Sequence, residues 1–297
     1  MMIPIIDTHQ HMWDLKEFSL PWLVDIESLN KSHNMVDYVT ASEGSGISKT
    51  IYMEVDVEPS QRSKEVDYVS DFCNRDDNPM VAAVVSGSPM EEGFIEIVKS
   101  YRNNPYVKGV RQVLHVPEMP RSSCLEGSFI DGIRCLGEAG KSFDVCMRPS
   151  ELSDALAMVL KCPDTLFILD HCGNADPQIV SGLSEPDGNE PFAHSRQQWL
   201  DDMSALGQCE NVVCKLSGII ARAPSGWNTD LLAPTVRHCI SSFGYDRVIV
   251  GGDWPVCNMG ATLGAWINSL REIIQDYKET EQRAILNENA VRIYQLS

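Results

Sequence analysis

The sequence predicts an α/β protein of a single domain: a (β/α)8 barrel with long loops after its strands. Eight short apolar runs rich in Val and Ile recur along the chain, as expected for buried parallel strands. Amphipathic segments separate these runs, which implies right-handed βαβ units. The 297 residues suit one such barrel, and no low-complexity linker or block of charge divides them. We therefore expect one domain over residues 1–297.

The strand predictions rest on length, β-branched content and flanking Gly or Pro. They cover residues 2–11, 48–57, 80–87, 107–115, 143–147, 165–173, 211–218 and 246–254.

The helix predictions rest on apolar residues that recur three and four positions apart. Residues 94–101 show this spacing at Phe94, Ile97, Val98 and Tyr101, and Ser150 is predicted to cap a helix over 150–160. Similar patterns occupy residues 61–73, 198–206, 262–275 and 280–294.

The connections are asymmetric. Those that lead into strands are short, whereas those that leave strands are long and rich in Pro, Gly, Asp and aromatic residues: 12–34, 116–128, 173–196 and 219–230. Because active sites of such barrels are built from the loops after the strands, this asymmetry predicts an enzyme.

Composition excludes several classes of protein. Apolar residues make up 43% and charged residues 22%, which is typical of a globular protein. The net charge of −18 argues against non-specific binding of nucleic acid or anionic membranes. No apolar run reaches the ~20 residues that span a bilayer, and the N-terminus lacks the basic region of a signal peptide. The ten cysteines form no CxxC pair, which favours free thiols in a reducing cytoplasm; Cys172 and Cys257, beside the motifs below, could instead be reactive.

The first strand ends in Asp7-Thr8-His9-Gln10-His11. Since side chains alternate along a strand, Asp7, His9 and His11 are expected to point together into the barrel mouth. Two imidazoles at this spacing can bind one divalent cation such as zinc, iron or nickel. The alternative is a pair of core histidines bonded to backbone.

The sixth and eighth runs end in LDHCG and GGDWP. By alternation, only one of Asp170 and His171 lines the mouth, and His171 is the better candidate for a ligand, an electrophile or a proton relay. Asp253 could serve as general base towards water. Alternatively, His171 is satisfied by a carboxylate, and Asp253 caps the helix that Pro255 begins.

Other polar and aromatic residues occupy strand ends and mouth loops. Buried acids and bases from different strands can pair inside a barrel, or they can bind a polar substrate. The aromatic side chains can stack on a ring or pack the loops. These candidate substrate-binding residues are Glu54, Arg111, His115, Lys215, Trp22 and Trp254, and Asp56 shares a predicted strand face with Glu54.

Nucleotide-binding motifs are absent: the chain has no GxGxxG after a strand and no P-loop, so we expect no nucleotide cofactor. It also lacks the GxSxG elbow of serine hydrolases and the HExxH motif of metalloproteases.

Taken together, the motifs IIDTHQHMWD, KGVRQ, LDHCGNADP, NVVCKLSG and RVIVGGDWPV resemble the amidohydrolase-related family, from about residue 5 to 295. They are most similar to its branch of lactonases, which includes L-fuconolactonase, L-rhamnono-lactonase and 2-pyrone-4,6-dicarboxylate lactonase. The resemblance implies a barrel that hydrolyses a lactone, with His9, His11, His171 and Asp253 as its active-site core.

The resemblance also implies roles. Asp253 would take a proton from water and return it to the leaving alkoxide, while His171 would polarise the carbonyl or help to bind a metal. The fourth and fifth strands lack the bridging carboxylate or lysine and the histidine of binuclear members. Because these ligands are missing, we expect either one divalent ion or no metal. A single ion, most readily zinc, would be held by His9, His11, His171 and Asp253.

Three further readings stay open beside a sugar-acid lactonase. A carboxylated pyrone or muconolactone could be the substrate, for which Arg111, Lys215, Arg148, Arg222 and His115 could supply cations if they converge. The protein could be a metal-dependent decarboxylase, or it could bind a ligand without turnover. The small-molecule lactone is the expected partner, and a homo-oligomer is left open.

Overall fold

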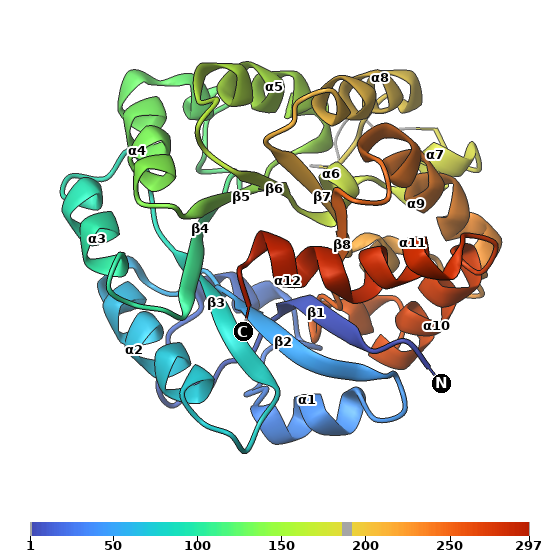
Figure 1. The fold of residues 1–297 in the computed structure, drawn as a ribbon, viewed down its shortest axis with the longest axis horizontal. Coiled ribbons are helices and arrows are strands. Elements are labelled where there is room, and N and C mark those ends of the chain that lie inside the picture. The colour runs from blue at the N-terminus through green and yellow to red at the C-terminus, as the bar shows by residue number, and fades with distance from the viewer. Residues whose placement is uncertain (1, 186–191, 297) are drawn as a thin grey trace.

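A computed structural model describes residues 2–185 and 192–296 and confirms the barrel: eight parallel strands follow one another in chain order around a single sheet (Figure 1). The strands are β1 (Ile5–Gln10), β2 (Ile47–Met53), β3 (Met80–Ser86), β4 (Val107–Val113), β5 (Ser142–Cys146), β6 (Phe167–Leu169), β7 (Val212–Leu216) and β8 (Val248–Val250). All eight lie within or beside the ranges expected from the apolar runs.

Helices surround the strands (Figure 1). They are α1 (Met35–Ala41), α2 (Arg62–Cys73), α3 (Phe94–Tyr101), α4 (Gly127–Glu138), α5 (Leu152–Lys161), α6 (His171–Asn174), α7 (Pro177–Ser181), α8 (Arg196–Gly207), α9 (Thr229–Phe243), α10 (Leu263–Ile273), α11 (Glu279–Arg283) and α12 (Asn289–Ile293). Short 3₁₀ turns are η1 (Pro21–Asp25), η2 (Pro59–Gln61), η3 (Ser123–Leu125), η4 (Pro149–Glu151), η5 (Ile219–Arg222) and η6 (Val256–Met259), and η7 (Ala284–Glu288) is a π-helical turn.

The helix over 94–101 is confirmed at both ends, but the predicted cap of the next one is wrong. Ser150 lies inside the 3₁₀ turn η4, and Glu151 precedes the first residue of α5. Pro149 explains the difference, because proline is well suited to open a helical turn before the α-helix begins. Of the loop expected over 173–196, residues 177–181 form α7 and residues 186–191 lie outside the described part.

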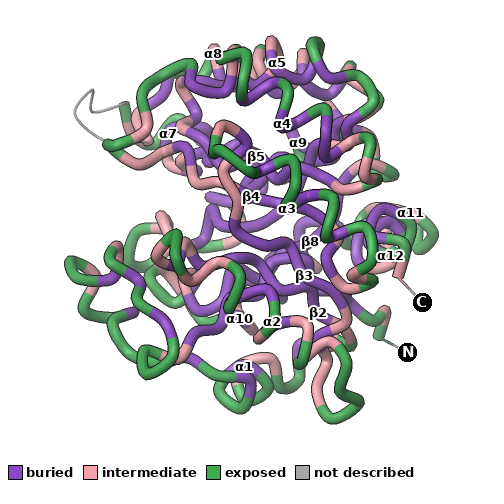
Figure 2. Tube along the Cα trace, turned by 90° about the vertical axis from the view of Figure 1, so that its left-hand side faces the viewer, coloured by how far each residue is buried: buried purple, intermediate pink, exposed green. Residues whose placement is uncertain are grey.

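Two apolar layers hold the barrel together. One lies between the strands and the surrounding helices, and the other fills the barrel. The strands at the centre of the molecule are mostly buried (Figure 2). The inner layer includes Ile6, Met53 and Ile249, and the side chains of Ile293 and Tyr294 from the C-terminal segment close it from below. Within the described residues, no helix combines the length and the apolar character needed to cross a bilayer.

Backbone pairing closes the barrel and brings the first and last motifs together. Gln10 bridges to Trp254, and the Asp253 N–H donates to the carbonyl of His9 at 2.8 Å. The His11 N–H in turn donates to the carbonyl of Trp254 at 2.9 Å. Residues 242 or more positions apart in the chain therefore meet at one point of the rim.

The expected shared face of Asp7, His9 and His11 is wrong for Asp7. The pairing of β1 with β2 shifts between Asp7 and Gln10, so alternation is interrupted there. The Asp7 carboxylate accepts hydrogen bonds from Tyr38 on the outer helix α1 and from the Gly252 N–H, at 2.8 and 2.7 Å. Asp7 therefore braces the β8 end from outside the barrel.

Above the inner apolar layer, Lys215 carries a buried charge. Its ammonium lies 2.7 Å from Asp144 and 2.8 Å from Asp170, and all three side chains are fully buried. The lysine of β7 therefore has acidic partners, as its burial requires: Asp144 on β5 and Asp170 directly after β6.

We predict that Lys215→Met destabilises the protein by about 3–5 kcal/mol, because it leaves two buried carboxylates without their cation. Lys99→Met is the matched control: Lys99 pairs with Glu96 at the surface, where ion pairs contribute about 1 kcal/mol or less. Urea denaturation of both variants would measure the difference. Equal midpoints would contradict the structural role of Lys215.

Candidate active site

The carboxyl ends of the strands open into a cavity of about 600 Å³. Six of the residues expected at the site line it: His11, Trp22, Arg111, His115, His171 and Asp253. Four others do not: His9, Glu54, Lys215 and Trp254 lie beneath or beside the lining. Asp56 also lines the cavity.

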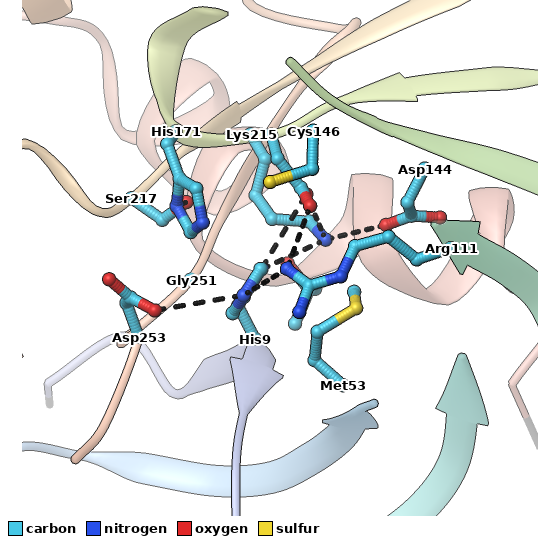
Figure 3. A network of polar contacts seen from close by, with 12 residues as sticks. His9, Met53, Arg111, Asp144, Cys146, His171, Lys215, Ser217, Gly251 and Asp253 are labelled. Atoms are coloured by element: carbon cyan, nitrogen blue, oxygen red, sulfur yellow. Dashed lines mark hydrogen bonds and ion pairs between the residues drawn. The ribbon is translucent and has the colours of Figure 1, made fainter. Parts of the chain in front are cut away.

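His9 lies beneath the cavity, at the centre of a network of polar contacts (Figure 3). Its Nε2 lies 3.2 Å from Nε2 of His11 and 3.7 Å from the Asp253 carboxylate. Nδ1 of His11 contacts the carbonyl of Met53 at 3.0 Å, which leaves its Nε2 directed at Asp253, 3.4 Å away. The imidazoles of His9 and His11 and the carboxylate of Asp253 thus converge on one point.

Two cations flank His9. The Lys215 ammonium lies 3.3 Å from Nδ1, and the Arg111 guanidinium lies 3.3 Å from Nε2. Burial lowers the pKa of His9 well below its usual value, and Lys215 lowers it further despite the carboxylate of Asp170. His9 is therefore neutral at physiological pH, which is the form that binds metals.

Arg111 and Glu54 form a buried ion pair rather than two free substrate contacts. Arg111 Nε donates to the Glu54 carboxylate at 2.6 Å, and its other nitrogens reach the Glu54 carbonyl at 2.9 Å and Asp170 at 3.3 Å. Burial would raise the pKa of Glu54, but the charge of Arg111, together with hydrogen bonds from Ser86 and the Asp56 N–H, holds the pKa below its usual value. Arg111 still lines the cavity, whereas Glu54 holds the Arg111 guanidinium in place.

Asp170 is the residue that strand alternation missed. It was expected to face away from His171, yet it is fully buried beneath His9, 3.5 Å from Nδ1. Burial would raise the pKa of Asp170, but Lys215 and His9 lower it well below the usual value. Alternation fails because β6 ends at Leu169, so Asp170 and His171 belong to the turn that follows.

That turn has an unusual backbone. His171, Cys172, Gly173 and Asn174 have φ values of 55°, 53°, 67° and 58°, so one left-handed turn carries His171 back over the cavity. The turn is held by the Trp199 indole, which donates to the Cys172 carbonyl at 3.0 Å, and by the Asn174 amide, which donates to Met147 at 2.8 Å. Strain of this kind persists only where surrounding contacts over-determine it.

His171 and Asp253 differ in charge. Nδ1 of His171 contacts the Ser217 hydroxyl at 3.0 Å, and burial lowers the pKa of the imidazole. Burial would raise the pKa of Asp253, but His171 and His11 lower it below the usual value. Asp253 is therefore an ionised carboxylate, as a base that activates water requires.

The residues present fit a divalent cation. Two overlapping groups of three offer ligand atoms within 4.8 Å of one another: His9, His11 and Asp253, and His9, Asp170 and His171. Imidazole and carboxylate are ligands that zinc accepts. The buried carboxylates of Glu54, Asp144, Asp170 and Asp253 outnumber the cations Arg111 and Lys215, which leaves an excess of negative charge for a cation.

Of the five cationic residues considered for a carboxylated substrate, Arg111, His115 and Arg222 line the cavity, whereas Lys215 and Arg148 do not. Arg148 donates to Glu151 and to the carbonyls of the β4 loop, and it does not line the cavity. Arg222 does line it: its guanidinium stacks 3.8 Å from the Phe192 ring and has no ion pair within the described residues. His115 lies in the lining as well, but burial and then Arg222 lower its pKa to about 3.

This barrel, with histidines at the end of its first strand and an aspartate after its eighth, has the architecture of a (β/α)8-barrel hydrolase. The amidohydrolase model matches residues 6–296, and the chain belongs to that family. An L-fucono-1,5-lactonase of Burkholderia ambifaria is 27% identical over 98% of this chain and 95% of its own.

Solved structures show the same fold. A zinc-bound amidohydrolase of Burkholderia multivorans has a TM-score of 0.83 and 20% identity, covering 99% of this chain and 100% of its own. A probable 2-pyrone-4,6-dicarboxylic acid hydrolase of Acinetobacter baumannii, with citric acid bound, has a TM-score of 0.74 and 14% identity, covering 98% and 99%.

We predict that Gly218→Ala displaces His171. A Cβ at Gly218 would lie 2.3 Å from His171 Nδ1, and the residue also has a positive φ of 71°. Gly226→Ala is the matched control, since Gly226 has φ of 79° but an added Cβ would meet nothing within 4 Å. Both variants should lose about 1–3 kcal/mol to backbone strain, but only Gly218→Ala should shift the imidazole NMR signals of His171. Unchanged signals in Gly218→Ala would contradict the packing described.

Proposed function

We propose that this protein hydrolyses a small lactone, first of all a sugar-acid lactone of the L-fucono- or L-rhamnono- type. The observation that carries the proposal is the ionised Asp253 carboxylate, which lines the cavity beside His171 and lies 3.4 Å from His11. The similarity to an L-fucono-1,5-lactonase along nearly the whole chain supports the substrate class.

The chain's own residues account for the proton transfer. Asp253 accepts a proton from a water held over the floor, and the water oxygen adds to the lactone carbonyl. The Arg111 guanidinium and the imidazole of His171 are the donors that can face the resulting oxyanion. Collapse of the adduct breaks the bond to the ring oxygen, Asp253 returns its proton to the leaving alkoxide, and the product is the hydroxy acid.

A metal ion would be held by His9, His11 and Asp253, with Asp170 and His171 as the second group. When bound, a divalent ion supplies Lewis acidity and lowers the pKa of water. We propose zinc, because the donor set suits it and because the Burkholderia multivorans relative carries it.

A lactone with one carboxylate is the second candidate, and Arg222 favours it. This guanidinium lines the cavity without a carboxylate partner among the described residues. Arg111, Lys215 and Arg148 are all engaged, so the cavity offers one unpaired arginine rather than the several cations that a dicarboxylate needs.

The test is a hydrolysis assay with a pH indicator on aldono-1,4- and 1,5-lactones and on lactones with one or two carboxylates. We expect acid release on deoxy-aldonolactones. Turnover confined to carboxylated rings would favour the second candidate. Release of carbon dioxide instead of a ring-opened acid would make the protein a decarboxylase.

We expect Asp253→Asn to lower kcat by about 10²–10⁴-fold, because the amide cannot accept the proton. Asparagine tolerates the positive φ of 56° at this position, so the fold should be retained. Asp131→Asn, at an exposed carboxylate, is the control. Thermal unfolding would verify that both variants fold, and wild-type kcat in Asp253→Asn would refute its role as the base.

Metal binding makes a separate prediction. After chelation and dialysis, the wild-type protein should bind about one zinc ion per chain, measured by elemental analysis and calorimetric titration. His11→Ala should lose this zinc, whereas His238→Ala should keep it, because His238 contacts the Leu200 carbonyl away from the site. Equal zinc content in the two variants would place the metal elsewhere.

A further inference from the structure

Asp56 is a second carboxyl group in the cavity that the hydrolytic machinery does not use. It follows β2 and lines the same cavity as Asp253 and Arg222. Within the described residues, no hydrogen bond or ion pair reaches its carboxylate, although its own N–H donates to Glu54 at 2.7 Å. Every other acid close to the floor has such a partner in the described structure: Glu54, Asp144, Asp170 and Asp253.

The backbone holds Asp56 in this position at a cost. Its φ is 50°, in the left-handed region that non-glycine residues rarely adopt. The bond from the Asp56 N–H to Glu54 fixes the turn, and Glu54 is itself fixed by Arg111 at 2.6 Å. His171 and Asp253 share this backbone region, so the strained positions gather around one cavity.

The sheet order places Asp56 beside the reacting centre. Going around the rim, Arg222 follows β7, Asp253 follows β8, His11 follows β1 and Asp56 follows β2. A lactone whose carbonyl lies over Asp253 and His11 therefore presents one part of its ring towards Arg222 and another towards Asp56.

Charge explains why this carboxylate needs a ligand. Glu54 and Glu118 repel it, while Arg111 and Arg62 attract it without pairing. Burial, and then Glu54, raise the pKa of Asp56 to about 6. A substrate that fills the cavity removes water from this carboxylate, and an unpaired desolvated carboxylate is costly. Hydroxyl groups on the substrate would supply the missing donors.

We propose that Asp56 is a specificity-determining residue that accepts hydrogen bonds from ring hydroxyl groups, so that the site prefers a hydroxylated lactone. The inference rests on the proposed lactonase function and narrows its substrate class. Two carboxylate oxygens can accept from neighbouring hydroxyls of a sugar-acid ring. A carboxylate of the substrate at the same place would be repelled.

The test compares a deoxy-hexono-1,5-lactone with δ-valerolactone, the same ring without hydroxyls. We expect Asp56→Ala to lower kcat/KM on the hydroxylated lactone by about 10–100-fold, the range for hydrogen bonds to a charged group. The loss should lie in KM, since the contact is made in ground and transition state alike. On δ-valerolactone the loss should stay below about threefold. Glu58→Gln, in the same loop outside the cavity, is the matched control.

The pH profile gives a second readout. Because the ionised form accepts hydrogen bonds, the wild-type KM for the hydroxylated lactone should fall as pH rises through about 6 and then level off. In Asp56→Asn, the KM for the hydroxylated lactone should no longer change as pH rises through about 6.

The remaining outcomes are distinguishable. If Asp56→Ala lowered kcat equally on both lactones, the proposal would be overturned, and Asp56 would take part in the chemical step. Unchanged kinetics on both lactones would also overturn it. If the wild-type protein opened neither ring, the lactonase assignment itself would fail, and the role of Asp56 with it.

Discussion

The buried charge network around His9 is the constraint on which the rest of the site depends. Lys215 and Arg111 approach its two ring nitrogens from opposite sides, and Asp170 contacts both cations from below. Removing ions of this kind from water costs several kcal/mol each, so the network is stable only when every charge has its partner. Since His9, Arg111 and Lys215 lie on β1, β4 and β7 and Asp170 follows β6, the position of His9 is set by the closed barrel rather than by any single segment.

Backbone strain is the second constraint on the site, and most of the strained residues lie around the cavity. Of the non-glycine residues with positive φ in the described structure, Asp56, His171, Asn174 and Asp253 line the cavity. Each such residue costs about 1–3 kcal/mol, which the surrounding barrel must offset. The strain turns side chains into the cavity that regular strands would direct sideways, so the catalytic arrangement depends on the departures from regular strand geometry.

These departures mark the limit of what the sequence could predict. The barrel and its eight strands follow from the apolar runs, because those signals are local and strong. The grouping of His9, His11 and Asp253 was implied by the resemblance of the motifs to the amidohydrolase-related family, and the three side chains do lie together. The side of Asp7 and the burial of Asp170 were missed, because a strand shift and an early strand end break alternation. Both are set by pairing with distant strands, which periodicity in a single sequence does not record.

Asp253 and Asp56, two of the carboxyl groups that line the cavity, show how one barrel can separate reaction from recognition. Neighbouring imidazoles lower the pKa of Asp253, whereas burial and Glu54 raise the pKa of Asp56 to about 6. Environments that push two pKa values apart assign different tasks to the same chemical group. Asp253, pinned between His11 and His171, suits attack by water. Asp56, whose carboxylate has no partner among the described residues, suits a ligand that brings its own donors. Arg222 lies on the other side of Asp253 along the rim, because it follows β7 whereas Asp56 follows β2.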